Sequence, residues 1–162
     1  MKEPKLCLSM PKSEFCLRWG NKKDSCAIGA LEARSQILEG RTSPCCDAQE
    51  LSKLWNIRFE KGTKVILALH VQSSQLAGFL SFKGELSHGN IQALYIEPKW
   101  IRRKVGSLLL RTAAALCTLR GGSSLQVTVL THNLRARNFY TSLHFRATGV
   151  KSSHLIYMQK EL

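Results

Sequence analysis

From Pro98 onward this sequence has no acidic residue until Glu161, the last position but one. No aspartate or glutamate occurs from Pro98 to Lys160, whereas the 162-residue chain carries 24 lysines and arginines and a formal net charge of +13. An acid-free half of a domain gives much of its surface a positive potential, which favours anionic partners such as phosphate groups, nucleic acid or an acidic protein. The alternative is a solvated basic surface with no particular ligand.

Long apolar runs are also missing. No stretch of about 18 apolar residues occurs, so no membrane-spanning helix is expected. Residues 2 to 5 are Lys, Glu, Pro and Lys, with only a short apolar patch beside them, so no secretory signal is expected either. The six cysteines form no C-x-x-C pair and have no matching histidine spacing, so neither a zinc site nor a disulfide framework is expected. We therefore expect a cytoplasmic, metal-free protein with one domain's worth of chain.

Apolar periodicity predicts alternating helices and strands after a weakly patterned N-terminus. Residues 1–24 are expected to be a short strand or a loose segment, followed by one domain over residues 25–162. Helices are predicted from Ser25 to a stop at Gly40, from Asp47 to Phe59, from Val105 to a stop at Gly121-Gly122, and from Asn133 to Leu143. Strands are predicted over Lys64–Val71, Gln75–Phe82, Ile91–Ile96, Leu125–Leu130, Phe145–Val150 and His154–Met158.

The segment from Ile91 to Leu110 combines an apolar strand that ends at Pro98, a basic turn and an amphipathic helix. The first turn of a helix has backbone N–H groups without internal partners and the positive end of the helix dipole. Arg102, Arg103 and Lys104 lie in that turn. The order of strand, cationic turn and helix therefore predicts a phosphate-binding site.

Two motifs in this half resemble signatures of the GCN5-related N-acetyltransferases, which transfer an acetyl group from acetyl-CoA to an amine. The first family pattern is V-x-P-x-[YW]-[RQ]-G-x-G-[IV]-G, and the second is N-x-x-A-x-x-[FL]-Y-x-x-x-G-F. The matching residues are, for the first, Ile96, Pro98, Trp100, Val105 and Gly106, and for the second, Asn133, Ala136, Phe139, Tyr140 and Phe145. The resemblance covers roughly Lys64 to the C-terminus.

The resemblance implies an α/β class, single-domain acyl-CoA N-acyltransferase (GNAT) fold. In this fold a mixed, mostly antiparallel central sheet is flanked by about four helices. The chain departs from the signatures at glycine positions, where it has Arg102, Lys104 and His144, and it has Ile101 in place of glutamine or arginine. Glycine serves in such turns because it adopts positive φ without steric cost and lets a phosphate approach the backbone. These departures bear on the activity that the resemblance implies more than on the fold.

The resemblance also implies where acetyl-CoA binds as cosubstrate. The strand backbone at Leu94, Tyr95 and Ile96 pairs with the pantetheine arm and the acetyl carbonyl, and the N–H of Ile96 polarises that carbonyl. The turn and the later helix complete the predicted cofactor-binding set: Arg102, Arg103, Lys104, Val105, Gly106, Ser107, Asn133, Asn138 and Tyr140. Asn133 could equally be a helix cap.

Catalysis by such a site needs a general acid and a general base. By resemblance, Tyr140 is the candidate acid for the departing thiolate, because a phenol is protonated at neutral pH; the alternative is a tyrosine that only ends an apolar stripe. Family members often have a carboxylate on the strand where this chain has Gln92. Glu85, His88 and Glu97 are nearby candidates for the base; His88 could instead be only a turn residue, and Glu97 an exposed strand end.

The basic surface bears on the acceptor amine as well. Like charges repel, so a polyamine or a lysine-rich tail is disfavoured, and a neutral or acidic peptide, an aminoacyl group on nucleic acid or a small amine metabolite is favoured. A homodimer is left open. The second hypothesis is a catalytically idle domain of the same fold that binds nucleic acid or a protein partner through its basic surface.

Overall fold

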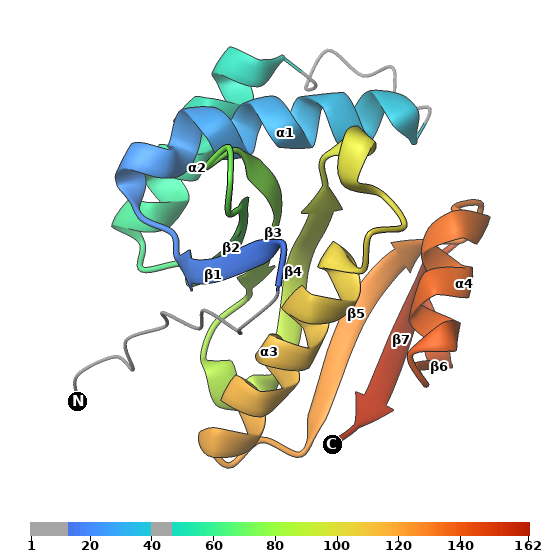
Figure 1. The fold of residues 1–162 in the computed structure, drawn as a ribbon. Helices are drawn as coiled ribbons and strands as arrows, with labels where there is room; N and C mark the ends of the chain where they lie inside the picture. The colour runs from blue at the N-terminus through green and yellow to red at the C-terminus, as the bar shows by residue number, and fades with distance from the viewer. Residues whose placement is uncertain (1–12, 40–46) are drawn as a thin grey trace. The chain divides into compact units, whose positions relative to one another are not determined.

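The computed structural model describes residues 13–39 and 47–162. It contains seven strands in one sheet, in the order β1-β2-β3-β4-β5-β7-β6, and the helices α1 to α4 (Figure 1). The mixed sheet is mostly antiparallel, which confirms the predicted fold class. No helix in the described ranges is long and apolar enough to cross a membrane. The predicted helix stop at Gly40 lies outside the described residues.

The chain divides into two compact units. The first comprises Met1–Ser81 and Ala93–Leu109, and the second comprises Phe82–Gln92 and Leu110–Leu162. Three elements contribute to both units: β3 (Leu76–Phe82), β4 (Asn90–Ile96) and α3 (Val105–Leu119).

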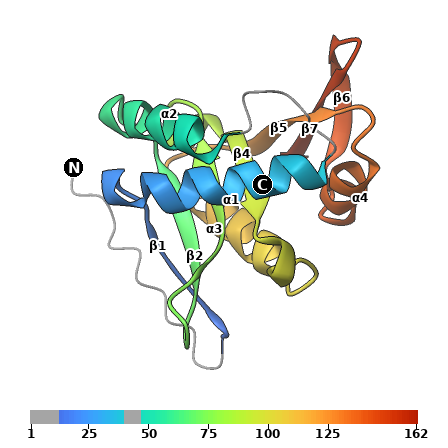
Figure 2. The same ribbon diagram turned by 90° about the horizontal axis from the view of Figure 1, so that it is seen from above.

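The first unit has an antiparallel sheet on which two helices pack. Its strands are β1 (Phe15–Trp19), β2 (Val65–His70), β3 (Leu76–Phe82, up to Ser81) and the last residues of β4. The helices α1 (Ser25–Leu38) and α2 (Ala48–Glu60) lie side by side (Figure 2). The β2 residues 65–68 are all buried, as their unbroken apolar run predicts.

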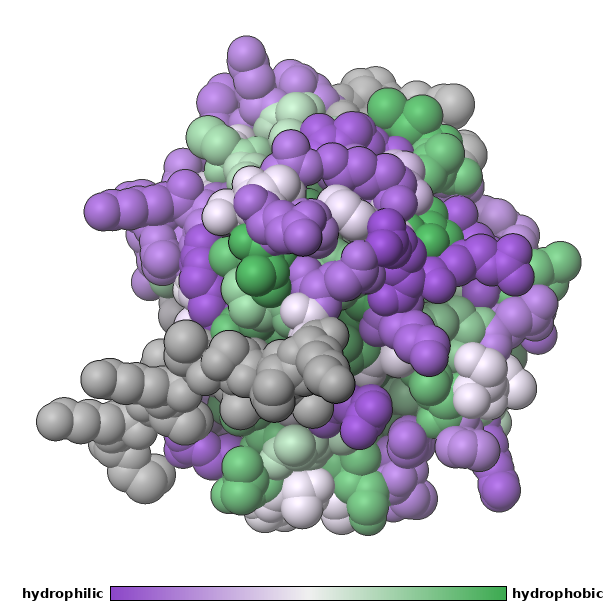
Figure 3. All heavy atoms as spheres, in the orientation of Figure 1, coloured by the Kyte–Doolittle hydropathy of each residue, from purple (hydrophilic) through white to green (hydrophobic). Residues whose placement is uncertain are grey.

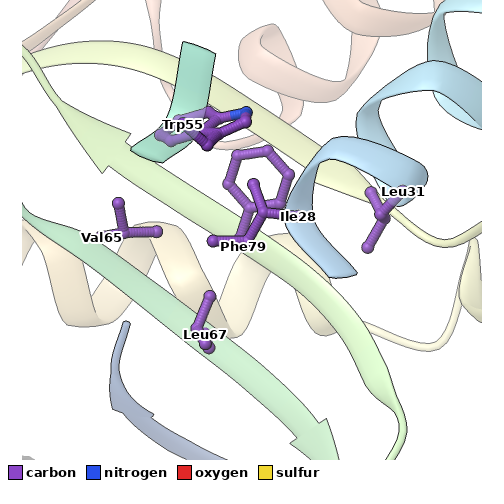
Figure 4. Packing of buried hydrophobic residues seen from close by; sticks show 6 residues of the cluster. All are labelled: Ile28, Leu31, Trp55, Val65, Leu67 and Phe79. Carbon is purple, nitrogen blue, oxygen red and sulfur yellow. The ribbon is translucent and has the colours of Figure 1, made fainter. Parts of the chain in front are cut away.

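Six buried side chains from both helices and two strands form the core of this unit (Figure 4): Ile28, Leu31, Trp55, Val65, Leu67 and Phe79. A polar network links the two helices beside this core. The carboxylate of Glu32 in α1 is 6% exposed and accepts hydrogen bonds from Trp55 Nε1 at 2.7 Å and Gln36 Nε2 at 2.9 Å. A buried polar group is tolerated when its hydrogen bonds are satisfied, so this network fixes how α1 meets α2.

The second unit is built on β5 (Ser124–Leu130), β6 (Arg146–Ser152) and β7 (Leu155–Glu161), with α4 (Leu134–Ser142) between β5 and β6 in sequence. The inward residues of β5, Leu125, Val127 and Val129, are buried and alternate with half-buried neighbours, as predicted. The first residues of β4 pair with β5 in parallel, and β7 lies antiparallel between β5 and β6.

The 3-10 turns are short: Lys22–Asp24, Leu86–His88 and Pro98–Trp100. The surface in Figure 3 is mixed, with apolar residues in separate small patches among polar ones on the face shown. Charged and polar residues separate these patches.

Candidate functional site

The sequence-predicted residues divide between the two units. The first unit holds the end of β4 and the turn up to Ser107, and the second holds Asn133, Asn138, Tyr140 and His88.

The end of β4 presents backbone groups along one free edge. The amide of Glu97 donates to the carbonyl of Ala77 in β3 at 2.9 Å. Since successive amides of a strand point to opposite edges, the N–H of Ile96 points away from β3. The parallel ladder between β4 and β5 comprises only Asn90 with Gln126 and Ile91 with Val127. The backbone edge of β4 beside Ile96 therefore takes no part in the ladder with β5. A strand end that binds a carbonyl group needs such an unpaired edge.

The side chains on this strand end have packing roles. Tyr95 packs against the core of the first unit, with its ring centroid 5.7 Å from that of Phe79. Leu94 is half-buried. By the same alternation the backbone N–H and C=O of Tyr95 point toward β3, so neither its ring nor its backbone faces the free edge.

The turn before α3 has unpaired amides. The N–H of Arg103 bonds the carbonyl of Trp100, and that of Leu108 bonds the carbonyl of Lys104. Within the described residues, however, no acceptor is bonded to the N–H of the following five residues: Arg102, Lys104, Val105, Gly106 and Ser107. These amides lie around the first turn of a 15-residue helix, where the helix dipole adds positive potential. The turn therefore offers hydrogen-bond donors to an anion, and phosphate binding there stays a prediction.

Two of the cations in this turn occupy the positions where the family signature has glycine. Arg102 has φ 67° and Lys104 has φ 63°, both in the left-handed region. A non-glycine residue there costs about 1–2 kcal/mol, so the turn keeps the glycine-type backbone and adds two charges. Both side chains are exposed and have no hydrogen bond or ion pair with any described residue. They are available to an anion.

The third predicted cation is engaged by the protein. Arg103 forms an ion pair with Glu14, and its guanidinium lies 5.2 Å from the ring centroid of Trp100. It remains half-exposed, with 46% of its side chain accessible. Arg103 therefore contributes positive potential to the turn while its guanidinium is held between Glu14, just before β1, and the ring of Trp100.

Glu97, a candidate base, is held by an arginine. Its carboxylate is 14% exposed and forms two hydrogen bonds with Arg34 of α1, at 2.6 and 3.1 Å. At the next position of α1, the hydroxyl of Ser35 donates to the carbonyl of Ile96 at 3.3 Å. A bidentate guanidinium stabilises the ionised carboxylate and occupies both of its oxygens. The pair also fixes α1 next to the end of β4.

In the second unit, α4 and its N-cap residue supply three candidate residues. The side chain of Asn133 caps this helix by accepting from the N–H of Ala136 at 3.0 Å, which leaves its amide nitrogen for other bonds. Asn138 is exposed. Tyr140 is 6% exposed, and its ring lies 5.2 Å from that of Phe145. Its role as an acid stays a prediction.

His88 lies in the 3-10 turn before β4, whereas Ile96 is the last residue of that strand. With a rise of about 3.3 Å per residue, a seven-residue strand is about 23 Å long. His88 makes no hydrogen bond or ion pair with any residue in the described ranges. The role of His88 as a base stays a prediction.

His144 is explained by the way α4 ends. The amides of His144 and Phe145 donate to the carbonyls of Thr141 and Tyr140, both at 3.0 Å, which defines a Schellman motif with His144 at the left-handed position. The C-termini of α2 and α3 have the same hydrogen bonds with Gly62 and Gly121 at that position. The predicted stop of α3 at the glycine pair is thus confirmed, and His144 takes a glycine's place without changing the backbone.

Three residues of the first unit were missed by sequence reasoning: Arg34, Ser35 and Glu14. Arg34 is 63 positions from Glu97, and Glu14 is 89 positions from Arg103. No spacing or motif in the sequence connects such pairs, because they meet only through the sheet and the helix on it.

The structure also has a surface cavity of about 270 Å³ at the start of β2, and it contains none of the predicted site residues. It is lined by Trp19, Gly20, Asn21, Lys22, Phe59, Glu60, Gly62, Thr63, Lys64 and Val65.

Comparison with protein families identifies the class. The model of the acetyltransferase (GNAT) family matches residues 19–145. The chain therefore belongs to the acetyltransferase (GNAT) family, which confirms the resemblance drawn from the two motifs. A comparison with curated proteins finds no match to this chain.

Solved structures agree on the fold. The PaiA N-acetyltransferase of Thermoplasma acidophilum, solved in complex with coenzyme A, is 18% identical and superposes with a TM-score of 0.77 over 93% of this chain and 100% of its own. An acetyltransferase of Thermus thermophilus is 21% identical, with a TM-score of 0.73 over 94% and 100%. At these identities the likeness shows the fold alone.

Proposed function

We propose that this protein transfers the acetyl group of acetyl-CoA to a primary amine of an acceptor that remains to be identified. The observation that carries the proposal is the turn before α3, in which five backbone amides have no acceptor among the described residues and two unpaired cations stand beside them. The membership of the family and the coenzyme A in the Thermoplasma acidophilum structure support it.

The residues of this chain fit the cosubstrate in a defined way. The N–H groups of the turn, together with Arg102 and Lys104, would bind the diphosphate of CoA. The edge of β4 at Leu94 and Ile96 would bind the pantetheine arm and the acetyl carbonyl. Binding of this kind needs a backbone edge that the sheet does not use, which β4 has beyond Ile91.

The chemistry needs three contributions from the protein. As the amine nitrogen bonds to the acetyl carbon, the N–H of Ile96 donates to the carbonyl oxygen and stabilises its negative charge. The carbon–sulfur bond then breaks, and the hydroxyl of Tyr140 gives its proton to the thiolate. The amine proton leaves to a base, for which Glu97 is nearer to Ile96 along the chain than His88; its pair with Arg34 would have to loosen for it to accept a proton.

Calorimetric titration with acetyl-CoA and CoA tests cofactor binding. If the two free cations bind phosphate, Arg102→Ala and Lys104→Ala should each weaken CoA by about 3- to 10-fold, which corresponds to roughly 1 kcal/mol at a partly exposed site. Arg111→Ala is the matched control, because Arg111 is exposed on α3 but lies beyond its first turn. Equal losses in all three variants, or no binding by the wild type, would contradict the proposal.

Turnover is tested separately with Tyr140→Phe. Release of free CoA thiol is measured with panels of neutral peptides, acidic peptides and small amines, and the phenylalanine variant should keep CoA binding and lose most of the rate. A variant that is as fast as the wild type would remove Tyr140 from the mechanism. A clear preference for polycationic acceptors would contradict the charge argument.

A second candidate function is favoured by the charge of the second unit. This unit has two acids, Glu85 and Glu161, against eight basic residues: Lys83, Arg111, Arg120, Arg135, Arg137, Arg146, Lys151 and Lys160. A domain of this kind could bind nucleic acid without catalysis, with an affinity that falls steeply with salt. Salt-sensitive RNA or DNA binding without any thermal shift on adding acetyl-CoA would select this function over the first.

A further inference from the structure

The turn that precedes α3 is packed against the N-terminal strands through one aromatic side chain. The indole of Trp100 stacks on the ring of His70, with centroids 4.6 Å apart and planes 28° apart. It also meets Phe15 edge-on, with centroids 5.5 Å apart and planes at 85°. Phe15 begins β1 and His70 ends β2, and the two are paired across these strands. Trp100 therefore rests on a preformed platform of two rings.

Two cations of the turn are fixed over the same indole. Lys99 and Arg103 each lie 5.2 Å from its centroid. Lys99 also donates a hydrogen bond to Gln75, and Arg103 pairs with Glu14. Cation–π contacts of this kind contribute about 0.5–1 kcal/mol each at exposed sites. The side chains on both sides of Trp100 thus connect the turn to the residues just before β1 and just before β3.

The position of the Trp100 indole leaves its N–H group without a hydrogen bond. Its Nε1 is enclosed and has no acceptor among the described residues. A buried unsatisfied donor costs about 1–3 kcal/mol, so packing, and not hydrogen bonding, holds Trp100 where it is. The adjacent backbone is also strained, since Arg102 and Lys104 have positive φ. A strained backbone persists only where its surroundings fix it.

We propose that Trp100 is a positioning residue that, together with His70 and Phe15, holds the turn Arg102–Ser107 in the conformation that binds phosphate. This inference rests on the function proposed above. A turn that is already ordered binds an anion without first losing conformational entropy, so the ring platform raises the affinity for the phosphate part of the cosubstrate. It gives the N-terminal strand β1 a role in a site that lies far along the chain.

The test compares Trp100→Leu, Trp100→Phe and His70→Ala with the wild type by calorimetry, with CoA and with pantetheine, which lacks the phosphates. Trp100→Leu should weaken CoA about tenfold, since two ring contacts contribute about 0.5–1.5 kcal/mol each, and should leave pantetheine unchanged. His70→Ala should show a smaller loss, and Trp100→Phe should restore most of the affinity. Phe59→Leu is the control, because Phe59 is a half-buried aromatic of the same unit that contacts Trp55 and not the turn.

Limited proteolysis supplies a readout that needs no cofactor. Trypsin cleaves after Arg102, Arg103 and Lys104, and mass spectrometry measures the rate of these cuts against cuts elsewhere in the same chain. Trp100→Leu should be cut several-fold faster there, while Phe59→Leu should not. If the wild type fails to bind CoA but this pattern holds, the function is wrong and the holding role of Trp100 stands. Unchanged cleavage and unchanged CoA affinity in Trp100→Leu would overturn the inference. It would also be overturned if Phe59→Leu lost affinity for CoA and for pantetheine by the same factor.

Discussion

Replacing His144 with glycine should stabilise this protein, although the substitution removes a whole side chain. His144 has φ 68° in the Schellman motif that ends α4, its side chain is exposed, and it makes no hydrogen bond or ion pair with any described residue. A side chain at that φ costs about 1–2 kcal/mol, whereas glycine has no such penalty. Glycine in turn makes the unfolded chain more flexible, which costs about 0.4–1 kcal/mol.

The two effects leave a net gain of about 0.5–1 kcal/mol in the free energy of unfolding. For a chain of this length that gain corresponds to a rise in the melting temperature of about 2 °C. Thermal and urea unfolding of the wild type, His144→Gly and His144→Ala measure it. The alanine variant should gain nothing, because alanine keeps the Cβ atom that makes the left-handed conformation unfavourable.

The other Schellman motifs supply the reverse experiment. Gly62 and Gly121 have φ 81°, and a Cβ added at either would meet no atom within 4 Å. Gly121→Ala therefore tests the backbone conformation alone, and it should lower the free energy of unfolding by about 1 kcal/mol. If His144→Gly is no more stable than His144→Ala, the claim that His144 occupies a glycine's place at an energetic penalty is refuted.

Two further predictions concern ionisable groups. Burial opposes the ionisation of Asp24, but hydrogen bonds from Arg18 and from the backbone outweigh it and leave the pKa of this carboxyl below its ordinary value. The stabilisation is therefore present above the unfolded pKa of about 3.9 and is lost as the pH falls through the lower folded value. Asp24→Asn should lower the free energy of unfolding by about 1 kcal/mol at pH 7, and urea titrations should show this difference from the wild type shrink progressively as the pH falls below about 4. Burial also raises the pKa of the Cys117 thiol, which is fully enclosed, whereas Cys26 is exposed. Because the thiolate reacts, iodoacetamide should label Cys26 well before Cys117 in the native protein, and equal rates by peptide mass spectrometry would show that the core of the second unit opens readily.

The strands and helices follow largely from the sequence, because their signals are local. The unbroken apolar run at β2, the alternation in β5 and the glycine pair after α3 each act on neighbouring residues, and all three have the predicted consequence in the structure. The same holds for the cationic turn after Pro98, since a helix start exposes its amides wherever it occurs.

The roles of individual charges were decided by tertiary structure. Arg102, Arg103 and Lys104 are equivalent in the sequence, yet Arg103 pairs with Glu14, 89 positions earlier, and the other two are left available to an anion. Glu97 likewise becomes the partner of Arg34 because α1 lies beside the end of β4. The sequence by itself determined where a helix start and a strand end occur. Only the tertiary structure decided which charges face them, because that depends on contacts between residues that are distant along the chain.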